Sequence, residues 1–379
     1  MIYRQLGSTG LRVSQLGFGA MRLPMTGAGA DARVDRELAV PMLRRAMELG
    51  VNYIDSAVGY CNGDSQRAVG DAIKGWPRET VVISTKNPCY GLDEKEWWTN
   101  LENSLERLGV SYIDMYNHHG MGWQGYTEHV LPRVGKWMRK AKDQGLVRHI
   151  ANSFHDNAEA LKKLVDSGYT SSITLRYNML DRTLEEGIAY AHEKGVGIVV
   201  MGPVGGGRLG ATSAVLEALV PGVRRVPELA LRFVLSNPGV CVALSGMSTM
   251  QQVEENCATA AGDVTLSAAD NATIQERIAP LKHLAKQFCT GCAYCVPCPA
   301  GVNIPNIFDK YNWGRAYGLW EAAREGYGQI SVVPWEPGKR ADACTACGVC
   351  ETKCPQKLPI REQLKEAHAA LTREFSSSV

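Results

Sequence analysis

Eight short apolar segments that alternate with amphipathic stretches limit the folds open to this chain more than any other feature. We expect them to form strands, at 15–20, 51–55, 80–85, 112–117, 147–152, 171–175, 196–201 and 240–245. The stretches between them have the periodicity of helices, as at 35–49, 97–108, 127–143, 157–167 and 226–235, and another helix is expected at 248–256 with Ser248 or Thr249 as its N-cap. This alternation favours a parallel α/β fold, and eight strands favour a closed (β/α)8 TIM barrel over an open doubly wound sheet.

The length of the chain leaves room for a second, smaller unit. The chain has 379 residues, whereas a (β/α)8 barrel takes about 250. We expect the barrel over 1–265, opening with a small hairpin at 1–14. The C-terminal unit is expected over 266–379, beginning with a linker helix at 266–287 and ending with a helix at 360–374.

Charge and hydropathy argue against two classes of partner. The net charge is +2 and 21% of the residues are charged, so nothing favours binding to nucleic acid or to an anionic membrane surface. No apolar run is long enough to cross a bilayer, and the first residues show no apolar core of signal-peptide length. We therefore expect a cytoplasmic protein with no membrane and no nucleic-acid partner.

Eight of the 12 cysteines lie in two short runs near the C-terminus. The first run, C-T-G-C-A-Y-C-V-P-C-P, begins at Cys289, and the second, C-T-A-C-G-V-C-E-T-K-C-P, begins at Cys344. Three closely spaced cysteines and a fourth before proline bind a [4Fe–4S] cluster in bacterial ferredoxins, where the fourth cysteine serves the other cluster. We therefore predict an α-helical, ferredoxin-like domain with two [4Fe–4S] clusters, one held by Cys289, Cys292, Cys295 and Cys354 and the other by Cys344, Cys347, Cys350 and Cys298.

A pair of structural zinc sites is the alternative for these cysteines, because C-x2-C pairs and sets of four thiolates also suit zinc. The three-in-a-row spacing and the terminal Cys-Pro favour iron–sulfur clusters. The first run is one residue shorter before its last cysteine, which makes Cys298 the least certain ligand. Since such clusters transfer single electrons, we expect a redox partner such as a ferredoxin or a flavoprotein.

Side chains able to move a proton follow three successive predicted strands. Asp55 ends the second strand, Lys86 follows the third, and His118 and His119 follow the fourth, while Tyr60 lies in the loop after Asp55. The C-terminal ends of barrel strands open on one face, where such folds place their active sites. Because successive strand side chains face opposite ways, at most one of the two histidines points into this mouth.

These residue types suit the reduction of a carbonyl group or the reverse oxidation. A tyrosine with a pKa near 10 is a poor acid at neutral pH, and a neighbouring ammonium lowers that pKa. We assign Tyr60 as the acid/base, Lys86 as the group that tunes it and Asp55 as the partner of Lys86, with a histidine orienting the substrate oxygen. Each residue alone would more often be a cap, turn or surface residue, but together they favour a site.

Two glycine-containing stretches follow the last two predicted strands. They are M-G-P-V-G-G-G-R-L-G at 201–210 and S-G-M-S-T at 245–249, and the second opens a helix. Barrels often bind phosphate at these positions through backbone N–H groups and a helix N-terminus, and glycine permits the backbone to approach a phosphate closely. A glycine run alone fits a flexible loop equally well.

Taken together, residues 2–260 resemble the aldo-keto reductase superfamily, and the whole chain resembles its ferredoxin-bearing branch. The matching pieces are R-Q-L-G-S-T-G-L-R-V-S-Q-L-G-F-G-A-M at the start, the Asp55/Tyr60 spacing, Lys86 after its strand, and Asp114-x-Tyr116 followed three residues later by His119. This last spacing selects His119 over His118. The resemblance implies a carbonyl/alcohol oxidoreductase that acts on a small molecule with a nicotinamide cofactor and without metal at the hydride step.

The resemblance also implies a set of cofactor contacts. Asn152 and Ser153 would lie near the nicotinamide amide, and Glu255 and Asn256 resemble the contacts on the adenine side. The loops after the last two strands would hold the dinucleotide, through Met201, Gly202, Pro203, Gly206, Gly246 and Gln252.

Three departures from the family's pattern bear on the cofactor. The amide-binding glutamine corresponds to Thr174, and the aromatic residue that stacks on nicotinamide corresponds to Met201. The basic residues that grip the 2′-phosphate correspond to Gly246 and Gln252. A phosphate without a basic partner loses charge-assisted hydrogen bonds. We therefore predict that the cofactor is NAD(H) in preference to NADP(H), or that nicotinamide binding is weak.

Two other functions stay open from the sequence. A hydride carries two electrons and a cluster transfers one, and the sequence shows no flavin site to couple them. The chain could be a reductase driven by its clusters or by ferredoxin with little or no nicotinamide use, or an electron-transfer or regulatory protein whose barrel senses nicotinamide. Trp123 and Tyr126, after His119, suit a sugar-like substrate as readily as surface packing.

Overall fold

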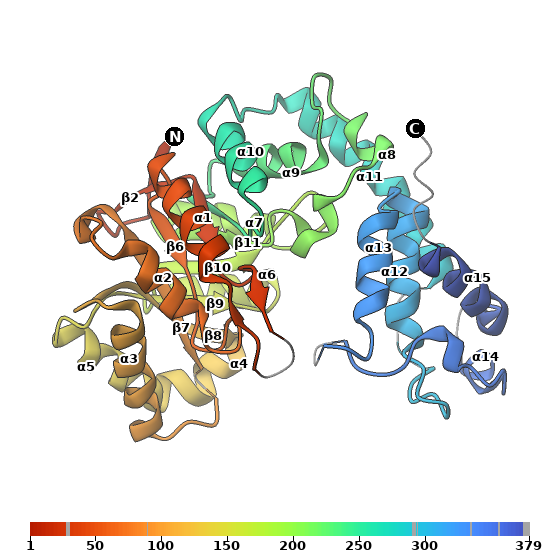
Figure 1. The fold of residues 1–379 in the computed structure, drawn as a ribbon, viewed down its shortest axis with the longest axis horizontal. Coiled ribbons are helices and arrows are strands. Elements are labelled where there is room, and N and C mark those ends of the chain that lie inside the picture. Colours follow the sequence, from red (N-terminus) through yellow and green to blue (C-terminus); the bar gives the residue numbers. More distant parts are fainter. Residues whose placement is uncertain are drawn as a thin grey trace. The chain divides into compact units, whose positions relative to one another are not determined.

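The eight predicted strands are present and close into a barrel (Figure 1). A computed structural model describes residues 1–27, 31–88, 90–289, 293, 295–333, 336–354 and 357–373, and the side chains of 281–288 are not described. Neighbouring strands run parallel and follow one another in chain order, with the last closing on the first. They are β3 (Leu16–Gly19), β6 (Tyr53–Asp55), β7 (Val82–Pro88), β8 (Ile113–Met121), β9 (Val147–Phe154), β10 (Ser172–Arg176), β11 (Gly197–Met201) and β12 (Val242–Ser245).

Helices follow the strands and surround the barrel (Figure 1), and several begin at caps visible in the sequence. Asp93 and Glu96 form a capping box at α3, Asn157 caps α6, and Thr249 rather than Ser248 caps α10. The helical segments from residue 36 to residue 261 are α1 (Arg36–Glu48), α2 (Ser65–Ile73), η2 (Arg78–Thr80), α3 (Glu94–Leu108), α4 (Trp123–Gly125), η3 (Tyr126–Val134), α5 (Gly135–Asp143), α6 (Ala158–Asp166), α7 (Glu185–Glu193), η4 (Gly205–Gly210), α8 (Ala214–Glu217), α9 (Val226–Leu235) and α10 (Met250–Ala261).

The helix predicted over 127–143 consists of two kinds of turn. Its first part, η3, is a π-helix, and its second part, α5, is an α-helix. Pro132 lies inside η3 and has no N–H to donate to an α-helical ladder, and the wider π turns accommodate this interruption. Gly135 lies at the junction, where a Cβ atom would come within 2.7 Å of the Val130 carbonyl oxygen.

The predicted N-terminal hairpin closes the barrel at the end where the strands begin. Its strands are β1 (Tyr3–Gln5) and β2 (Arg12–Ser14), and the fully buried Leu6 and Val13 belong to the apolar cluster inside the barrel. Gly7 has a φ of +52°, and a Cβ atom there would lie 2.4 Å from the backbone nitrogen of Gly197, the first residue of β11. Only glycine allows this approach. A second ribbon, β4 (Met25–Thr26) with β5 (Arg33–Val34), lies between β3 and α1.

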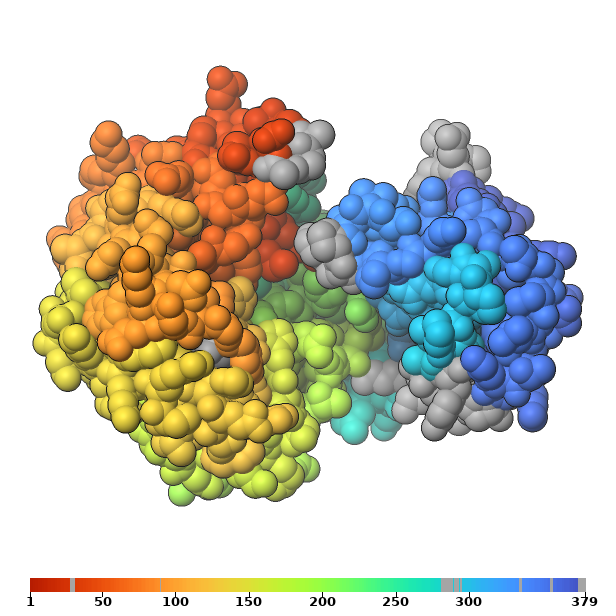
Figure 2. Space-filling view, turned by 90° about the horizontal axis from the view of Figure 1, so that it is seen from below, coloured from red at the N-terminus to blue at the C-terminus, as the bar shows by residue number. Residues whose placement is uncertain are grey.

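The chain divides into two compact units, the first comprising 1–206 and 230–266 and the second comprising 207–229 and 267–379. The described part of the second unit beyond residue 266 is helical, and its segments gather into one body in the space-filling view (Figure 2). Within it, α12 packs against α11, α13 and α15. Its elements are α11 (Ala268–Phe288), α12 (Ile304–Tyr317), α13 (Trp320–Gln329), η5 (Ala341–Ala343), α14 (Val349–Lys353) and α15 (Ile360–Thr372).

The segment 207–229 follows the glycine-rich stretch after β11 and packs within the second unit. The hydroxyl of Ser213 donates a hydrogen bond to the carbonyl oxygen of Tyr317 at 2.6 Å, and the guanidinium of Arg208 lies 4.2 Å from the ring centre of Trp313. The chain thus joins the second unit directly after Gly206. The domain boundary predicted at residue 265 stays a prediction, because compactness does not show which segments fold together. None of the helices in the described residues has both the length and the apolar character of a membrane span.

Candidate active site

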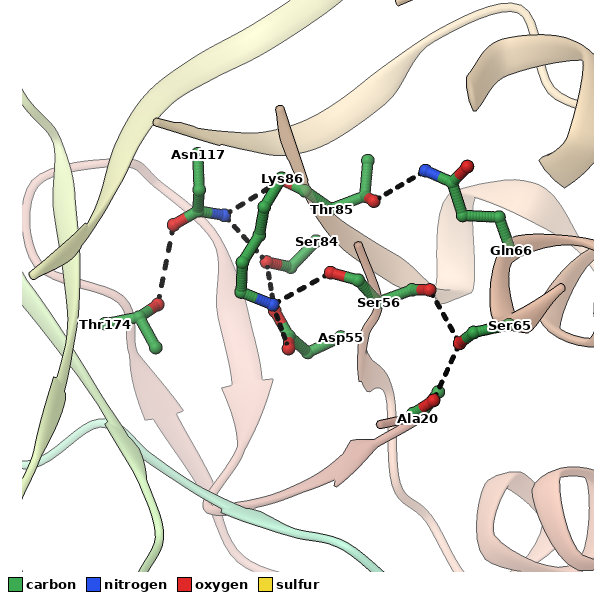
Figure 3. Close-up of polar contacts among 10 residues, drawn as sticks. All are labelled: Ala20, Asp55, Ser56, Ser65, Gln66, Ser84, Thr85, Lys86, Asn117 and Thr174. Atoms are coloured by element: carbon green, nitrogen blue, oxygen red, sulfur yellow. Dashed lines mark hydrogen bonds and ion pairs between the residues drawn. The ribbon is translucent and has the colours of Figure 1, made fainter. Parts of the chain in front are cut away.

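A buried ion pair lies at the C-terminal ends of β6 and β7. The Nζ atom of Lys86 lies 2.5 Å from Oδ2 of Asp55, and it also donates to the carbonyl oxygen of Ser56 at 2.8 Å (Figure 3). The side chains of Lys86 and Asp55 are only 1% and 5% exposed. Two charges removed from water in this way need close pairing and further hydrogen bonds, and this arrangement provides both.

Polar side chains of the neighbouring strands hold the pair in place. Ser84 donates to the second carboxylate oxygen of Asp55 at 2.8 Å, and Asn117 donates to Ser84 at 3.0 Å (Figure 3). Thr174 donates to Asn117 at 3.5 Å. All three are buried. The network links β6, β7, β8 and β10 across the barrel and fixes the orientation of the Asp55 carboxylate.

Tyr60 lies against this pair, as its proposed role requires. The Lys86 ammonium is 4.7 Å from the centre of the Tyr60 ring, and the ring of His119 meets the Tyr60 ring edge-on at 5.8 Å between centroids. The structure therefore brings Tyr60, Lys86, Asp55 and His119 together at one mouth of the barrel. Their chemical roles stay predictions.

Burial changes the expected electrostatics of Tyr60. It raises the pKa of the phenol, and this outweighs the lowering that the charge and hydrogen bond of Lys86 produce. The sequence analysis considered only the effect of the lysine. Burial likewise lowers the pKa of Lys86, but the Asp55 carboxylate and Tyr60 raise it by more. At neutral pH, Tyr60 therefore holds its proton and Lys86 its charge, which is the state needed to donate a proton to a carbonyl oxygen.

The two adjacent histidines face different surroundings. His118 is fully buried, and its Nε2 shares a hydrogen bond of 2.9 Å with the hydroxyl of Tyr169, away from Tyr60. His119 is half-buried beside Tyr60, and burial, with the nearby charges of Lys86 and His155, lowers its pKa to about 4. This geometry agrees with the choice of His119 over His118. A neutral imidazole can donate a hydrogen bond to a substrate oxygen without competing for the proton of Tyr60.

Asn152 offers a buried amide with nothing to satisfy it within the described residues. It lies on β9 next to His118, it is 0% exposed, and neither its side-chain oxygen nor its nitrogen has a hydrogen-bond partner there. A buried amide left in this state is costly. A carboxamide presents the complementary donor and acceptor, so the nicotinamide amide fits this position, beside the buried Ser153.

The predicted dinucleotide loops adopt open, glycine-dependent conformations. Gly202 and Gly206 have φ values of +65° and +70°, Pro203 between them is buried, and Met201 is half-buried. In the next loop, the Gln252 side chain accepts hydrogen bonds from the backbone N–H and hydroxyl of Ser248. Gln252 is exposed, and through these hydrogen bonds it supports the start of α10.

On α10, the two predicted adenine-side residues differ in exposure. Asn256 is buried and donates to the Ser245 hydroxyl at 3.1 Å, whereas Glu255 is half-buried and accepts from Gln251 at 2.9 Å. Trp123 and Tyr126 pack on each other with ring centres 5.4 Å apart, and Tyr126 is 5% exposed. Tyr126 therefore belongs to the core.

The predicted cluster ligands lie in the second unit, apart from Cys292, which falls outside the described residues. Among the residues that the structure describes, no three His, Cys, Asp or Glu side chains form a ready-made metal cage. The donor chemistry nevertheless fits a cluster. Cys344 accepts a hydrogen bond from the backbone N–H of Ala346 at 3.4 Å, and backbone N–H groups of this kind stabilise cluster sulfurs. Burial, with the neighbouring charges of Glu351 and Cys344, raises the pKa of the Cys350 thiol.

Comparison with known proteins decides the family. Residues 15–279, well over half of the chain, match the model of the Aldo/keto reductase family. The chain belongs to this family. Residues 288–358 match the model of a 4Fe-4S dicluster domain. The predicted family, barrel fold and oxidoreductase class are thereby confirmed, and this aldo/keto reductase carries an iron–sulfur dicluster domain after its barrel.

Relatives of this aldo/keto reductase match most of their own length. It is 27% identical over 323 residues to the NADH-specific methylglyoxal reductase of Escherichia coli, covering 72% of this chain and 96% of that protein. It is 28% identical over 281 residues to the L-galactose dehydrogenase of Arabidopsis thaliana, covering 67% of this chain and 86% of that protein. Among solved structures, an aldo-keto reductase from Bacillus halodurans in its holo form superposes with a TM-score of 0.61 at 29% identity. The superposition covers 73% of this chain and 96% of that chain.

The sequence analysis did not single out two residues that hold the site of this aldo/keto reductase. Ser84 and Asn117 support Asp55, yet serine and asparagine inside strands carry no motif of their own. A signal was present in the spacing: Ser84 precedes Lys86 by two positions, so both side chains face the same side of β7.

Proposed function

We propose that this aldo/keto reductase interconverts a carbonyl group and an alcohol on a small molecule, with Tyr60 as the acid/base. The observation that supports this most directly is the buried pair of Lys86 and Asp55 beside Tyr60, with the neutral His119 against the same ring. An ion pair this deeply buried is costly to keep, and its position beside a phenol gives it a chemical use.

A nicotinamide dinucleotide bound beside Asn152 would supply the hydride. As the carbonyl carbon accepts the hydride, the Tyr60 hydroxyl donates its proton to the carbonyl oxygen, so that a C–H and an O–H bond form while the C=O π bond breaks. Lys86 stabilises the phenolate that remains until solvent returns the proton. His119 donates a hydrogen bond to the same oxygen and holds it toward Tyr60.

We further propose that the cofactor is NADH in preference to NADPH. Gly246 carries no charge, and the Gln252 side chain is already engaged with Ser248, so neither supplies a cation for a 2′-phosphate. The name of the E. coli relative, an NADH-specific reductase, supports this choice. The names of that relative and of the Arabidopsis dehydrogenase also support a small oxo or hydroxy compound, such as a sugar, as the substrate.

For the second unit we propose two [4Fe–4S] clusters, with the ligand sets assigned above from the cysteine spacing. The dicluster match over 288–358 supports the cluster type. When bound, such clusters transfer single electrons. The chain would use them to exchange electrons with a redox partner, a ferredoxin or a flavoprotein.

The test is Tyr60→Phe in the anaerobically purified full chain. This change removes the proton donor and leaves the ring that Lys86 contacts. General acid catalysis contributes about 10²- to 10⁴-fold, so carbonyl reduction should fall by that range while NADH binding and the visible absorbance of the clusters stay unchanged. Full activity in the variant would refute the proposed role. Turnover with reduced ferredoxin but not with NADH would favour the cluster-driven reductase instead.

A further inference from the structure

An arginine in the second unit holds its charge against the turn between two predicted cluster ligands. Arg361 lies in the first turn of α15, and its Cζ and Nη1 atoms lie 3.7 and 3.8 Å from the position that a Cβ atom of Gly348 would take. Gly348 follows Cys347 directly and precedes Cys350 by two positions. The second cysteine run therefore has a guanidinium packed on its backbone, from a helix that begins beyond the run.

Glu351, the residue after Cys350, fixes the orientation of this guanidinium. Its Oε2 atom accepts a hydrogen bond from Nε of Arg361 at 3.0 Å and lies 2.8 Å from Nη2, and its Oε1 atom accepts from the backbone N–H of Arg361 at 2.9 Å. With two of its three nitrogens held in this way, the guanidinium presents Nη1, which has no partner among the described residues, beside Gly348. A planar guanidinium with free N–H groups can still donate to an anion.

The turn against which Arg361 packs already has the backbone of an anion site. Ala346 and Gly348 have φ values of +56° and +79°. Turns of this kind point successive N–H groups into a concavity that holds anions, iron–sulfur clusters among them. One of these N–H groups, that of Ala346, donates to Sγ of Cys344 at 3.4 Å. A guanidinium at the same turn adds a full positive charge to surroundings that already favour negative charge.

The charge of Arg361 reaches the predicted ligands as well as Glu351. The pKa of Arg361 is raised, chiefly by the hydrogen bond and the charge of Glu351, and the sulfurs of Cys350 and Cys344 contribute in the same direction. Electrostatic coupling acts both ways, so the same guanidinium stabilises negative charge at those sulfurs. The alternative use of the pair is to join α14 to α15, which would leave the electron affinity of a cluster unchanged.

We propose that Arg361, without being a ligand, raises the reduction potential of the cluster assigned to Cys298 and the first three cysteines of the second run. On reduction this cluster gains one electron, and no bond forms or breaks. The added negative charge lies beside the guanidinium, which therefore favours the reduced state. Charges and hydrogen bonds around the sulfurs are among the means by which a protein sets such potentials. Arg361 thereby directs electrons to this cluster. The assignment rests on the proposed clusters.

The experiment is an anaerobic potentiometric titration of the full chain with soluble one-electron mediators, followed by visible absorbance and electron paramagnetic resonance. Arg361→Gln removes the charge and keeps a polar side chain. Glu351→Gln removes the neighbouring negative charge and keeps an oxygen that can accept from Arg361. Arg373→Gln is the matched control, because it removes an exposed arginine at the other end of α15, about 18 Å away along the helix axis.

A hydrogen bond to a charged group changes an equilibrium by roughly 10- to 100-fold. The side chain of Arg361 is 48% exposed, which places its effect near the lower end. Arg361→Gln should therefore make one of the two one-electron reductions about tenfold less favourable, which lowers its potential by about 59 mV. Glu351→Gln should raise the potential of the same step, and Arg373→Gln should change neither step. Iron content should be the same in all variants, because none of these residues is a ligand.

Unchanged potentials in Arg361→Gln at full iron content would overturn the assignment and leave the pair with Glu351 as a structural link between two helices. If Arg361→Gln loses its clusters, Glu351→Gln decides, and an unchanged or lowered potential in that variant would overturn the assignment as well. Both results leave the proposed clusters intact. A wild-type chain without two one-electron steps, or one that holds zinc, would instead refute the proposed clusters, and the role of Arg361 with them.

Discussion

Replacing Asp55 by asparagine tests the electrostatic basis of the site. The change keeps the shape of the side chain and an oxygen that can accept from Ser84, but it removes the negative charge 2.5 Å from Lys86. The new amide would present N–H groups to an ammonium that is itself a donor. Lys86 would remain buried, with the Ser56 carbonyl and Tyr60 as its remaining partners.

The expected cost follows from that burial. Removing one member of a buried ion pair costs about 3–5 kcal/mol, and the remaining contacts of Lys86 place this variant at the lower end. The cost depends on pH in a defined direction. In the wild type the pKa of Lys86 is raised, so its contribution to stability is complete below 10.5 and is lost as pH rises through the folded value. Without Asp55, burial lowers that pKa, so the deficit is largest near neutral pH and shrinks as the pH approaches the ordinary pKa of lysine.

Urea unfolding followed by circular dichroism gives the free energy of unfolding. The visible absorbance of the iron–sulfur unit, recorded in the same samples, distinguishes unfolding of that unit from unfolding of the barrel. Glu254→Gln is the matched control, because it breaks the exposed ion pair with Arg45 and should cost far less than Asp55→Asn. The double variant Asp55→Asn with Lys86→Met should be more stable than Asp55→Asn alone, with a coupling energy of about 2 kcal/mol or more. A loss in Asp55→Asn no larger than in Glu254→Gln, or additive effects, would refute the reasoning.

Three further outcomes are expected. Because the pKa of His119 is lowered to about 4, it is neutral throughout pH 5–9, so carbonyl reduction should show no inflection near 6.5; an inflection there that His119→Gln abolishes would contradict this. Asn152→Ala should weaken NADH binding by about 1–3 kcal/mol in a fluorescence titration, yet leave the ligand-free chain no less stable, since the amide has no partner among the described residues; a destabilised variant would show that the amide is satisfied. Cys350→Ser should remove one of two clusters and about half of the bound iron; a colourless wild type that holds zinc would refute the cluster prediction.

Much of the fold and part of the site could be predicted from residues close together in the sequence. The eight strands follow from apolar runs, and the caps at Asp93 and Thr249 follow from local hydrogen-bonding side chains. Asp55 and Lys86 could be paired in advance, because parallel neighbouring strands bring their C-terminal ends together. The choice of His119 needed the family spacing, since two adjacent histidines cannot be told apart by periodicity alone.

What the amino-acid order determined is therefore the set of elements, the cysteine pattern and the side chains at the strand ends, because each depends on neighbours along the chain. The tertiary structure decided what depends on surroundings. Burial outweighs Lys86 in setting the pKa of Tyr60, and the Asn152 amide is enclosed without a partner among the described residues. The hydrogen bonds from Thr174 through Asn117 and Ser84 to Asp55 join strands far apart in sequence. Desolvation and side-chain reach arise only when distant segments pack together, so no local pattern records them.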